Sequence, residues 1–483
     1  MFRKKSMTYT LFLKNYAHSF QSFHSMPKED CNMEKRSLFY PLDQEGLTTL
    51  RIQYDWKTGN FFLQASKDWD EDFDWSRYNH DFYVESIKTR TARLLNDVET
   101  RAMYEKYGIS DYLEEVIDLV RQGKHFGIDC FYNKRLDIRY LGNMHNRKRG
   151  INNTRHGVMK GGIRRHEKDE NELEVIIDGL NLARAMTFKN IAGELPVGGC
   201  KSCVMMDELD LNNMDVCGFL AFCLDEMRCS TGPDMGFPTE MTNVMKDNGF
   251  SVQYTCGPNG PLGSSSPPTA YGVFVALKEA VRFLNGSDDM TGMSFAVQGL
   301  GEVGASMAGL IADNVKDAKI YVADINSARV DEIVAKYRAK GVDMEAIAPE
   351  DVLFAKVDVL SPCAMGGILS EETIPKLNCK IIWGSANNQI KASSVEEECR
   401  LSKLLAERNI LFQTDWWHNT AGVMFGYEEY KYQKDASLKR TYDDIDRVLP
   451  KNTWLNLNKA KELGLTPTEC AYKTVMDELY GDD

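Results

Sequence analysis

Three glycines with the spacing Gly-x-Gly-x-x-Gly constrain the fold of this chain most strongly, because they lie between an expected strand and an expected helix. Gly299, Gly301 and Gly304 follow the apolar run MSFAVQ and precede the run ASMAGLIADNV. The first glycine permits a tight turn, the second lets the backbone approach a phosphate group, and the third lets the helix lie close to the strand. Unpaired N–H groups at the start of such a helix attract an anion. The pattern therefore predicts a pyrophosphate site.

An acidic residue at the end of the next expected strand indicates which dinucleotide would bind. Asp324 lies in the run KIYVADI, 20 residues after Gly304. A carboxylate there accepts hydrogen bonds from the two ribose hydroxyls of an adenosine and repels a 2′-phosphate. The alternative is a glycine-rich turn followed by an aspartate that only caps the next helix. We expect NAD rather than NADP.

Runs typical of strands and helices alternate in the second half of the chain, which predicts a parallel sheet covered by helices on both faces. The segment GPLGSSSPP is the clearest break between two domains in this 483-residue chain. We therefore predict an α/β protein of two domains. Residues 1–135 would form an N-terminal extension with the start of the substrate domain, and residues 136–265 the core of the catalytic substrate-binding domain. Residues 266–425 would form a doubly wound NAD-binding domain, and residues 426–483 a C-terminal helical segment.

The first half offers weaker local signals. The runs TLRIQYDW and NFFLQAS predict two strands joined by a turn at Lys57–Asn60, and the acidic, Trp-rich stretch Asp68–Asp74 predicts a surface loop. Apolar residues three and four apart predict helices over residues 81–123 and 172–190. The second of these helices would deliver Lys189, and the Gly- and Pro-containing loop after it would deliver Lys201.

Charge and composition exclude several classes of partner. The chain carries a formal charge of −13, which disfavours nucleic acid and anionic membranes. Its 12 cysteines lack the spacing of a disulfide framework, so we expect a cytoplasmic protein. The first 28 residues hold five basic side chains and no acidic one, which fits either a targeting segment or a solvated arm. The eight histidines form no metal-binding motif, so no metal is expected.

Three lysines near glycines or the end of a helix form the predicted reactive group. Lys160, Lys189 and Lys201 lie in MKGGIR, MTFKN and GGCKS, where Gly161-Gly162 and Gly198-Gly199 would let the backbone approach another group closely, which a solvated lysine does not require. Ammonium groups in one cleft bind a carboxylate and lower one another's pKa, so that one could act as a neutral base. Asp234, in TGPDMG, is the acid expected to exchange protons with that base.

Eight segments in order resemble the glutamate/leucine/phenylalanine/valine dehydrogenases. They are MKGGIRRH, ARAMTFKNIAGELPVGGCKS, GPDMG, SSSPPTAYGV, VQGLGEVG, VADIN, LSPCAMGG and GSANNQI, and they cover about residues 150–430. The resemblance implies an N-terminal α/β domain for substrate binding and oligomerisation, a Rossmann-type NAD domain, and C-terminal helices that pack back. It also implies a homo-oligomer that acts on a small amino acid, without nucleic acid or membrane partners.

The resemblance implies roles for individual residues. Lys201 would be the catalytic lysine and Asp234 the proton-shuttling acid. The substrate would be held by Lys160, Gly161, Gly162, Lys189 and Asn388. The cofactor would be held by Thr269, Gly299, Gly301, Glu302, Val303, Gly304, Asp324, Ala364 and Asn388. The implied reaction is the reversible, NAD-dependent oxidative deamination of an L-amino acid to the 2-oxo acid and ammonium.

The residues give opposing signals on the side chain of the substrate. The cofactor half is similar to leucine and phenylalanine dehydrogenases, whereas Lys160 matches the lysine with which glutamate enzymes meet the side-chain carboxylate. Gly426, however, stands where those enzymes carry a serine for the same carboxylate. We expect an apolar or aromatic substrate, with Lys160 paired to a protein carboxylate instead. The alternatives are a glutamate dehydrogenase and a non-catalytic NAD-binding scaffold.

Overall fold

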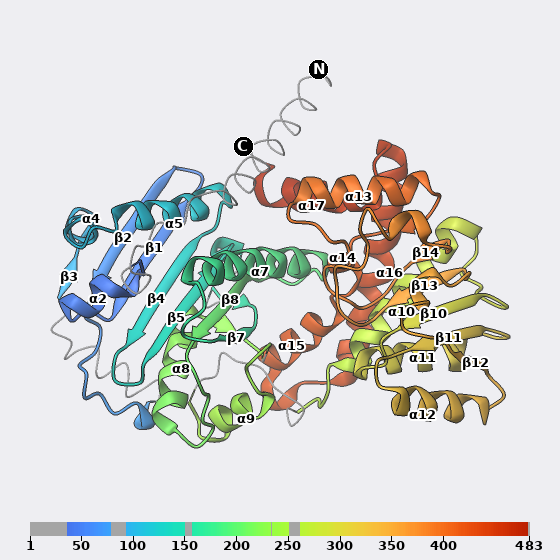
Figure 1. The fold of residues 1–483 in the computed structure, drawn as a ribbon, viewed down its shortest axis with the longest axis horizontal. Helices are drawn as coiled ribbons and strands as arrows, with labels where there is room; N and C mark the ends of the chain where they lie inside the picture. Colours follow the sequence, from blue (N-terminus) through green and yellow to red (C-terminus); the bar gives the residue numbers. More distant parts are fainter. Residues whose placement is uncertain (1–35, 79–92, 150–156, 233, 251–260, 482–483) are drawn as a thin grey trace.

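Two sheets organise the computed structural model, which describes residues 36–78, 93–149, 157–232, 234–250 and 261–481 (Figure 1). Within these residues the first sheet has the strand order β3-β2-β1-β4-β5-β8-β6-β9, with β7 paired to β8. The second has the order β12-β11-β10-β13-β14-β15. This two-part α/β architecture is the one predicted from the sequence.

The first sheet is largely antiparallel and contains the predicted hairpin. Its strands are β1 Thr49–Asp55, β2 Asn60–Ser66, β3 Leu94–Leu95, β4 Gly127–Asn133, β5 Ile138–Met144, β6 Met159–Lys160, β7 Ile163–His166, β8 Gly198–Met205 and β9 Cys229–Ser230. Asp55 pairs with Asn60 across the expected turn. Near the far end of the sheet, β6, β7 and β9 run parallel to their neighbours. The carboxyl ends of these short strands carry the candidate site.

Helices cover both faces of this sheet. On one face lie α2 Phe39–Glu45, α4 Asp97–Lys106, α5 Ser110–Gln122 and α7 Glu172–Ala192, and on the other lie α8 Met214–Met227 and α9 Thr239–Asp247. The predicted helical region 81–123 is therefore confirmed by α4 and α5, whereas Leu94–Leu95 form strand β3 and residues 81–92 lie outside the described residues. The prediction of a surface loop at Asp68–Asp74 is only partly correct, because Trp69 is 7% exposed and packs against Phe219 and Phe222.

The second sheet is entirely parallel, as predicted. Its strands are β10 Ser294–Gln298, β11 Lys319–Ala323, β12 Asp343–Ala346, β13 Val359–Pro362, β14 Ile381–Ile382 and β15 Leu411–Phe412. The helices α10 Ser266–Asn285, α11 Glu302–Asn314, α12 Ser327–Arg338 and α13 Val395–Glu407 pack against its two faces. Short 3₁₀ turns lie at η2 Trp75–Arg77, η3 Val352–Phe354, η4 Ile374–Lys376 and η5 Gln433–Asp435.

The last helices join the two halves, which confirms that the C-terminal segment packs back. They are α14 Asp415–His418, α15 Ala421–Tyr432, α16 Leu438–Leu463 and α17 Pro467–Tyr480. Helix α16 packs along α10, while α17 reaches α7 and the first sheet. There Tyr480 meets Trp56 edge to face at 4.9 Å, and Arg149 Nη2 lies 3.1 Å from the Glu478 carboxylate.

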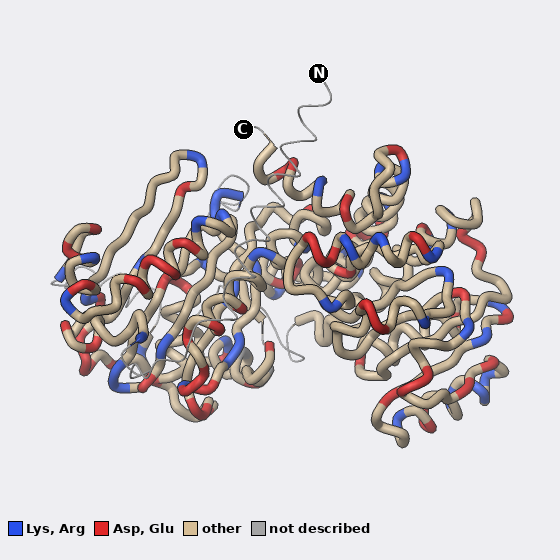
Figure 2. Tube along the Cα trace, turned by 45° about the horizontal axis from the view of Figure 1, so that its top comes forward, with Lys and Arg blue, Asp and Glu red and all other residues tan. Residues whose placement is uncertain are grey.

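The surface mixes both signs of charge. Figure 2 shows Lys and Arg interspersed with Asp and Glu along both halves. Among the described helices, none is long and apolar enough to cross a membrane.

Candidate active site

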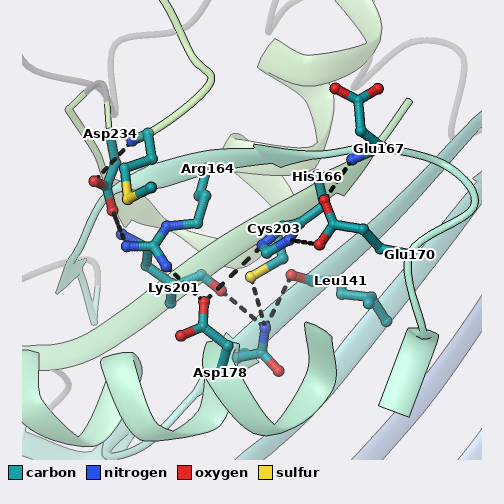
Figure 3. A network of polar contacts seen from close by, with 11 residues as sticks. Leu141, Arg164, His166, Glu167, Glu170, Asp178, Lys201, Cys203 and Asp234 are labelled. Atoms are coloured by element: carbon teal, nitrogen blue, oxygen red, sulfur yellow. Dashed lines mark hydrogen bonds and ion pairs between the residues drawn. The ribbon is translucent and has the colours of Figure 1, made fainter. Parts of the chain in front are cut away.

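Lys201 and Asp234 form an ion pair at the centre of the candidate site (Figure 3). Lys201 lies on β8 and is 5% exposed, whereas Asp234 follows β9. Arg164 of β7 places Nη2 3.3 Å from the same carboxylate and Nη1 2.7 Å from Asp178 of α7. Burial raises the pKa of Asp234, but the positive charges of Lys201 and Arg164 outweigh it, so the net pKa lies below its usual value. Asp234 is therefore held as a carboxylate, the form that accepts hydrogen bonds from Lys201 and Arg164.

The structure corrects the predicted setting of Lys201, which is a strand and not a tight loop. All eight residues of β8 are buried, because the strand pairs with β5, β6 and β7 and packs under α7. Asn143 of β5 is the register partner of Lys201. A buried strand holds an amine in place more firmly than a loop would, which suits a residue that must meet a substrate.

The glycines next to Lys160 and Lys201 lack a side chain for different physical reasons. A Cβ at Gly162 would come within 3.1 Å of Lys201 Nζ, so this glycine leaves space in front of the amine. In contrast, a Cβ at Gly161, Gly198 or Gly199 would strike the backbone oxygens of Cys200, Asn146 and Ala183 at 2.0, 1.7 and 2.2 Å. The close approach expected at both glycine pairs is therefore present at these three, where the neighbouring group is protein backbone and the glycines serve close packing.

Lys189, at the end of α7, reaches across to the second half of the chain. Its Nζ donates a hydrogen bond of 2.6 Å to Asn387 Oδ1, which also accepts one from Asn419 Nδ2 at 3.0 Å. Burial lowers the pKa of Lys189, while the nearby Asp415 carboxylate opposes that change. Lys189 therefore lies at the junction of the two halves.

The predicted residue Asn388 lies beside this contact. Its backbone N donates to Asp415 at 3.1 Å, and its φ of 51° is in the left-handed region. Asn387, which sequence analysis missed, is the one that meets Lys189. The segment GSANNQI signals both asparagines, but spacing alone does not distinguish two consecutive residues of one type.

Lys160 lies on β6 and is attracted by a buried carboxylate that sequence analysis also missed, Glu429 of α15. Lys160 is 6% exposed and Glu429 of α15 is 3% exposed. Burial lowers the pKa of Lys160, with Glu429 opposing and Lys201 adding to that change. Burial raises the pKa of Glu429 to about 7. Glu429 is thus a candidate for the protein carboxylate expected near Lys160, and it is far away in the sequence.

The glycine-rich turn after β10 has the geometry that a dinucleotide requires. Gly299 has a φ of 86°, and a Cβ there would lie 2.7 Å from that of Ala364, which brings the loop after β13 beside the turn. A Cβ at Gly304 would strike Gly299 O at 1.9 Å, whereas nothing lies within 4 Å of that position at Gly301. The turn is therefore tight, packed against its helix, and open on the side where a pyrophosphate would lie.

Asp324 follows β11 and stays ionised. Its carboxylate accepts hydrogen bonds from Asn326 N at 2.8 Å and Leu300 N at 2.6 Å. These two bonds lower the pKa of Asp324. The bond to Leu300 ties the acidic residue to the glycine-rich turn, so that both would contact one dinucleotide.

The other predicted cofactor residues lie around this turn. Glu302, the first residue of α11, accepts hydrogen bonds from Ser264 Oγ at 3.3 Å and Ser266 Oγ at 2.8 Å. Val303 is partly buried and packs against the hydrophobic core around the second sheet. Thr269 donates to Ser265 O at 2.8 Å, and a Cβ at Gly422 of α15 would approach Thr269 Oγ1 to 2.9 Å. Helices α10 and α15 therefore meet at Thr269.

His418 is a packing residue at the end of the short helix α14. It is fully buried, stacks on Trp383 with 4.2 Å between ring centroids, and burial lowers its pKa to about 3. In the described ranges of the chain, no cluster of three or more His, Cys, Asp or Glu side chains could hold a metal ion.

Comparison with known proteins identifies the family. Residues 263–463 match the family described as Glutamate/Leucine/Phenylalanine/Valine dehydrogenase, and residues 143–248 match its dimerisation domain. The leucine dehydrogenase of Geobacillus stearothermophilus is 34% identical over 62% of this chain and 79% of its own. The phenylalanine dehydrogenase of Lysinibacillus sphaericus is 34% identical over 60% of this chain and 75% of its own.

A solved structure gives the same result. L-tryptophan dehydrogenase from Nostoc punctiforme has a TM-score of 0.63 and 25% identity, and covers 74% of this chain and 97% of its own. The candidate site therefore lies in an enzyme with the fold and the motifs of amino acid dehydrogenases. The chain is an oxidoreductase that belongs to the glutamate/leucine/phenylalanine/valine dehydrogenase family.

Proposed function

We propose that this enzyme catalyses the reversible, NAD-dependent oxidative deamination of an L-amino acid with an apolar or aromatic side chain. The products are the 2-oxo acid and ammonium. The observation that carries this proposal is the ion pair between the buried Lys201 and the partly exposed Asp234, with Gly162 leaving space in front of the amine. A base and an acid in contact, next to open space and a dinucleotide turn, suit the removal of a hydride and of protons from one carbon–nitrogen bond.

Different residues bind the substrate and transfer protons in the proposed reaction. Lys189 binds the α-carboxylate, with help from the backbone of Gly162. Lys201 loses its proton through Asp234, and as a neutral amine it accepts protons from the substrate amine and from the attacking water. Asp234 passes those protons to solvent, which its lowered pKa permits. When bound, the nicotinamide ring supplies the acceptor for the hydride that leaves the α-carbon.

We propose NAD as the preferred cofactor because Asp324 is an ionised carboxylate next to the glycine-rich turn. It would accept the ribose hydroxyls and repel a 2′-phosphate. The pyrophosphate would lie at the turn from Gly299 to Gly304, including Glu302 and Val303. Thr269 and Ala364 would contact the nicotinamide half, with Asn388 between cofactor and substrate.

The substrate class follows from two observations. The relatives named leucine and phenylalanine dehydrogenase are each 34% identical to this chain. Lys160, the residue that favours an acidic side chain, is already attracted by the Glu429 carboxylate. An apolar or aromatic side chain is therefore the better match, and glutamate is the second candidate because of Lys160 itself.

We also propose a homo-oligomer, since residues 143–248 match a domain named for dimerisation. The domain boundaries predicted above are retained as proposals, because β1–β9 and β10–β15 form separate sheets. A cytoplasmic location is proposed on the grounds that the cysteines among the described residues are free thiols, which suits a reducing compartment.

The test is the growth of absorbance at 340 nm with a panel of L-amino acids at alkaline pH, using NAD⁺ and NADP⁺ in parallel. We expect turnover with leucine, valine, phenylalanine or tryptophan, and a clear preference for NAD⁺. Turnover with glutamate alone would replace the proposed substrate class. Absence of turnover with every amino acid would overturn the proposed function.

A further inference from the structure

The loop that carries Asn387 lies against the short helix α14. This loop follows β14 and α14 follows β15, and the two strands are parallel neighbours in the second sheet. Their carboxyl ends therefore lie at one edge of the sheet, the edge at which the glycine-rich turn follows β10. The sheet thus brings the loop and the helix together beside the candidate site.

Asp415, the first residue of α14, holds the backbone of this loop. One carboxylate oxygen accepts a hydrogen bond from Asn388 N at 3.1 Å, and the other accepts one from Gln389 N at 3.2 Å. Asp415 is 4% exposed, so water does not readily replace these bonds. The bond to Asn388 N also fixes a backbone with a φ of 51°, a left-handed conformation that is uncommon for residues other than glycine.

Asn419, directly after α14, orients the side chain of Asn387. Its Nδ2 group donates hydrogen bonds to Ser385 O at 3.3 Å and to Asn387 Oδ1 at 3.0 Å. The same oxygen of Asn387 accepts the hydrogen bond from Lys189 Nζ. The acceptor that meets the proposed substrate-binding lysine is therefore placed by residues at the two ends of one helical turn.

Helix α14 also contacts the element that carries the lysine. Trp416 of α14 packs on Phe188 of α7 with 5.4 Å between ring centroids, and Phe188 immediately precedes Lys189. The two rings belong to one buried hydrophobic cluster. Helix α14 thus fixes the donor and the acceptor of the hydrogen bond between Lys189 and Asn387.

We infer that Asp415 is a positioning residue for binding of the substrate carboxylate, because it holds Asn387 where it orients Lys189. This inference rests on the proposed function. The side chain of a lysine is long and flexible, so an ammonium without a fixed acceptor samples many positions. An ammonium that is already oriented binds a carboxylate at a lower cost in entropy.

The charge of Asp415 has a second effect on Lys189. Burial lowers the pKa of Lys189, and the Asp415 carboxylate is the largest influence that opposes this change. Lys201 lowers the pKa of Lys189 further, whereas Asp234 raises it. His418 also lies near Lys189 but is neutral, because burial lowers its pKa to about 3. Asp415 therefore favours the ammonium form of Lys189, which is the form that attracts a carboxylate.

The main test is Asp415→Asn, which keeps the size of the side chain but leaves one oxygen to accept from two N–H groups. The loop should shift and release Lys189 from Asn387. KM for the amino acid and KM for the 2-oxo acid should each rise about tenfold, the effect of one lost hydrogen bond to a charged group. KM for ammonium should change little, because ammonium has no carboxylate.

A second readout follows the charge of Lys189. The inhibitor is isocaproate, which is leucine without its amine and stays a carboxylate throughout the alkaline range. Its inhibition constant should rise at alkaline pH as Lys189 loses its proton. In Asp415→Asn this rise should begin at lower pH, because Lys189 has lost a nearby negative charge while Lys201 and Asp234 are unchanged.

Asp358→Asn is the matched control. Asp358 also accepts a backbone hydrogen bond, from Ser294 N at 2.9 Å, and pairs with Lys380 at 2.8 Å. It precedes β13 and so lies at the opposite edge of the same sheet. Asp358→Asn should lower Tm, yet it should change neither the KM values nor the pH dependence of inhibition. A loss of stability alone is thereby separated from a loss of positioning.

Hydrogen exchange of the wild-type enzyme covers the case in which Asp415→Asn does not fold. Without substrate or cofactor, the amides of Asn388 and Gln389 should exchange far more slowly than those of an unfolded chain, because both donate to a buried carboxylate. Exchange at the rate of an unfolded chain overturns the inference. A folded Asp415→Asn also overturns it if its KM for the 2-oxo acid or its inhibition profile is unchanged. Absence of turnover with every amino acid in the wild type contradicts the proposed function instead.

Discussion

Lys189 and Asn387 join the two halves of the enzyme through a hydrogen bond of 2.6 Å. Lys189 comes from α7 under the first sheet, and Asn387 lies in the loop after β14 of the second sheet. The ammonium proposed to hold the substrate carboxylate is therefore oriented by the domain that would carry the cofactor. We therefore expect substrate binding at Lys189 Nζ to depend on the position of the two halves of the enzyme relative to each other.

Asn387→Asp tests that coupling. An aspartate would form an ion pair with Lys189 and repel the α-carboxylate, so KM for the amino acid should rise about tenfold or more. KM for the 2-oxo acid should rise in the reverse reaction, whereas KM for ammonium should change little because it has no carboxylate. Equal changes in all three constants would contradict a carboxylate-binding role for Lys189.

Gly162→Ala and Gly161→Ala should separate activity from stability. The methyl group at position 162 would lie 3.1 Å from Lys201 Nζ and displace the amine, which should lower kcat about 10–100-fold with little change in Tm. At position 161 it would lie 2.0 Å from Cys200 O, which should lower the free energy of unfolding by about 1–3 kcal/mol. Thermal unfolding and steady-state kinetics on both variants check this. A Gly162→Ala enzyme with normal kcat would show that the space before Lys201 is not used.

Asp324→Asn tests the choice of cofactor. Without the negative charge, the kcat/KM ratio of NAD⁺ over NADP⁺ should fall about tenfold, because a 2′-phosphate is no longer repelled. Asp313→Asn is a suitable control, since Asp313 pairs with Lys340 on the surface at 2.8 Å. An unchanged ratio in Asp324→Asn would assign the selectivity to other residues.

Glu398 should make stability depend on pH. Burial raises its pKa from the usual value of 4.5 to about 7, although Tyr472 and Thr414 donate hydrogen bonds to it at 2.6 and 2.8 Å. A raised carboxyl pKa means that the folded state binds the proton more tightly, so this stabilisation is complete below pH 4.5 and is lost as pH rises through 7. Between pH 6 and 8, the Tm of the wild type should therefore fall more than that of Glu398→Gln. Parallel Tm profiles would contradict the raised pKa.

The second sheet is predicted well because the sequence patterns that indicate its strands and helices are local. Each expected strand and helix from residue 266 onward is a continuous run with its own period, and the turn at Gly299 depends on a few adjacent residues. The prediction for Lys201 failed for the opposite reason. The glycines of GGCKS suggest a turn, yet they serve contacts with Asn146 and Ala183 that come from distant parts of the chain.

Long-range partners account for what else was missed. Glu429 approaches Lys160 from a helix at the other end of the sequence, and no spacing rule links the two. The acidic run around Trp69 predicts an exposed residue, but Trp69 is buried against Phe219 and Phe222 of α8. Burial and charge pairing of this kind depend on tertiary structure, which single-sequence patterns do not contain.

The most direct test of the central claim is the turnover of Lys201→Ala, measured together with its affinity for NADH. We predict that kcat with the best amino acid falls by at least about a hundredfold, because proton transfer through the Lys201–Asp234 pair is lost. The dissociation constant for NADH should stay within about twofold, since the glycine-rich turn is untouched. Near-normal turnover in this variant would contradict the account.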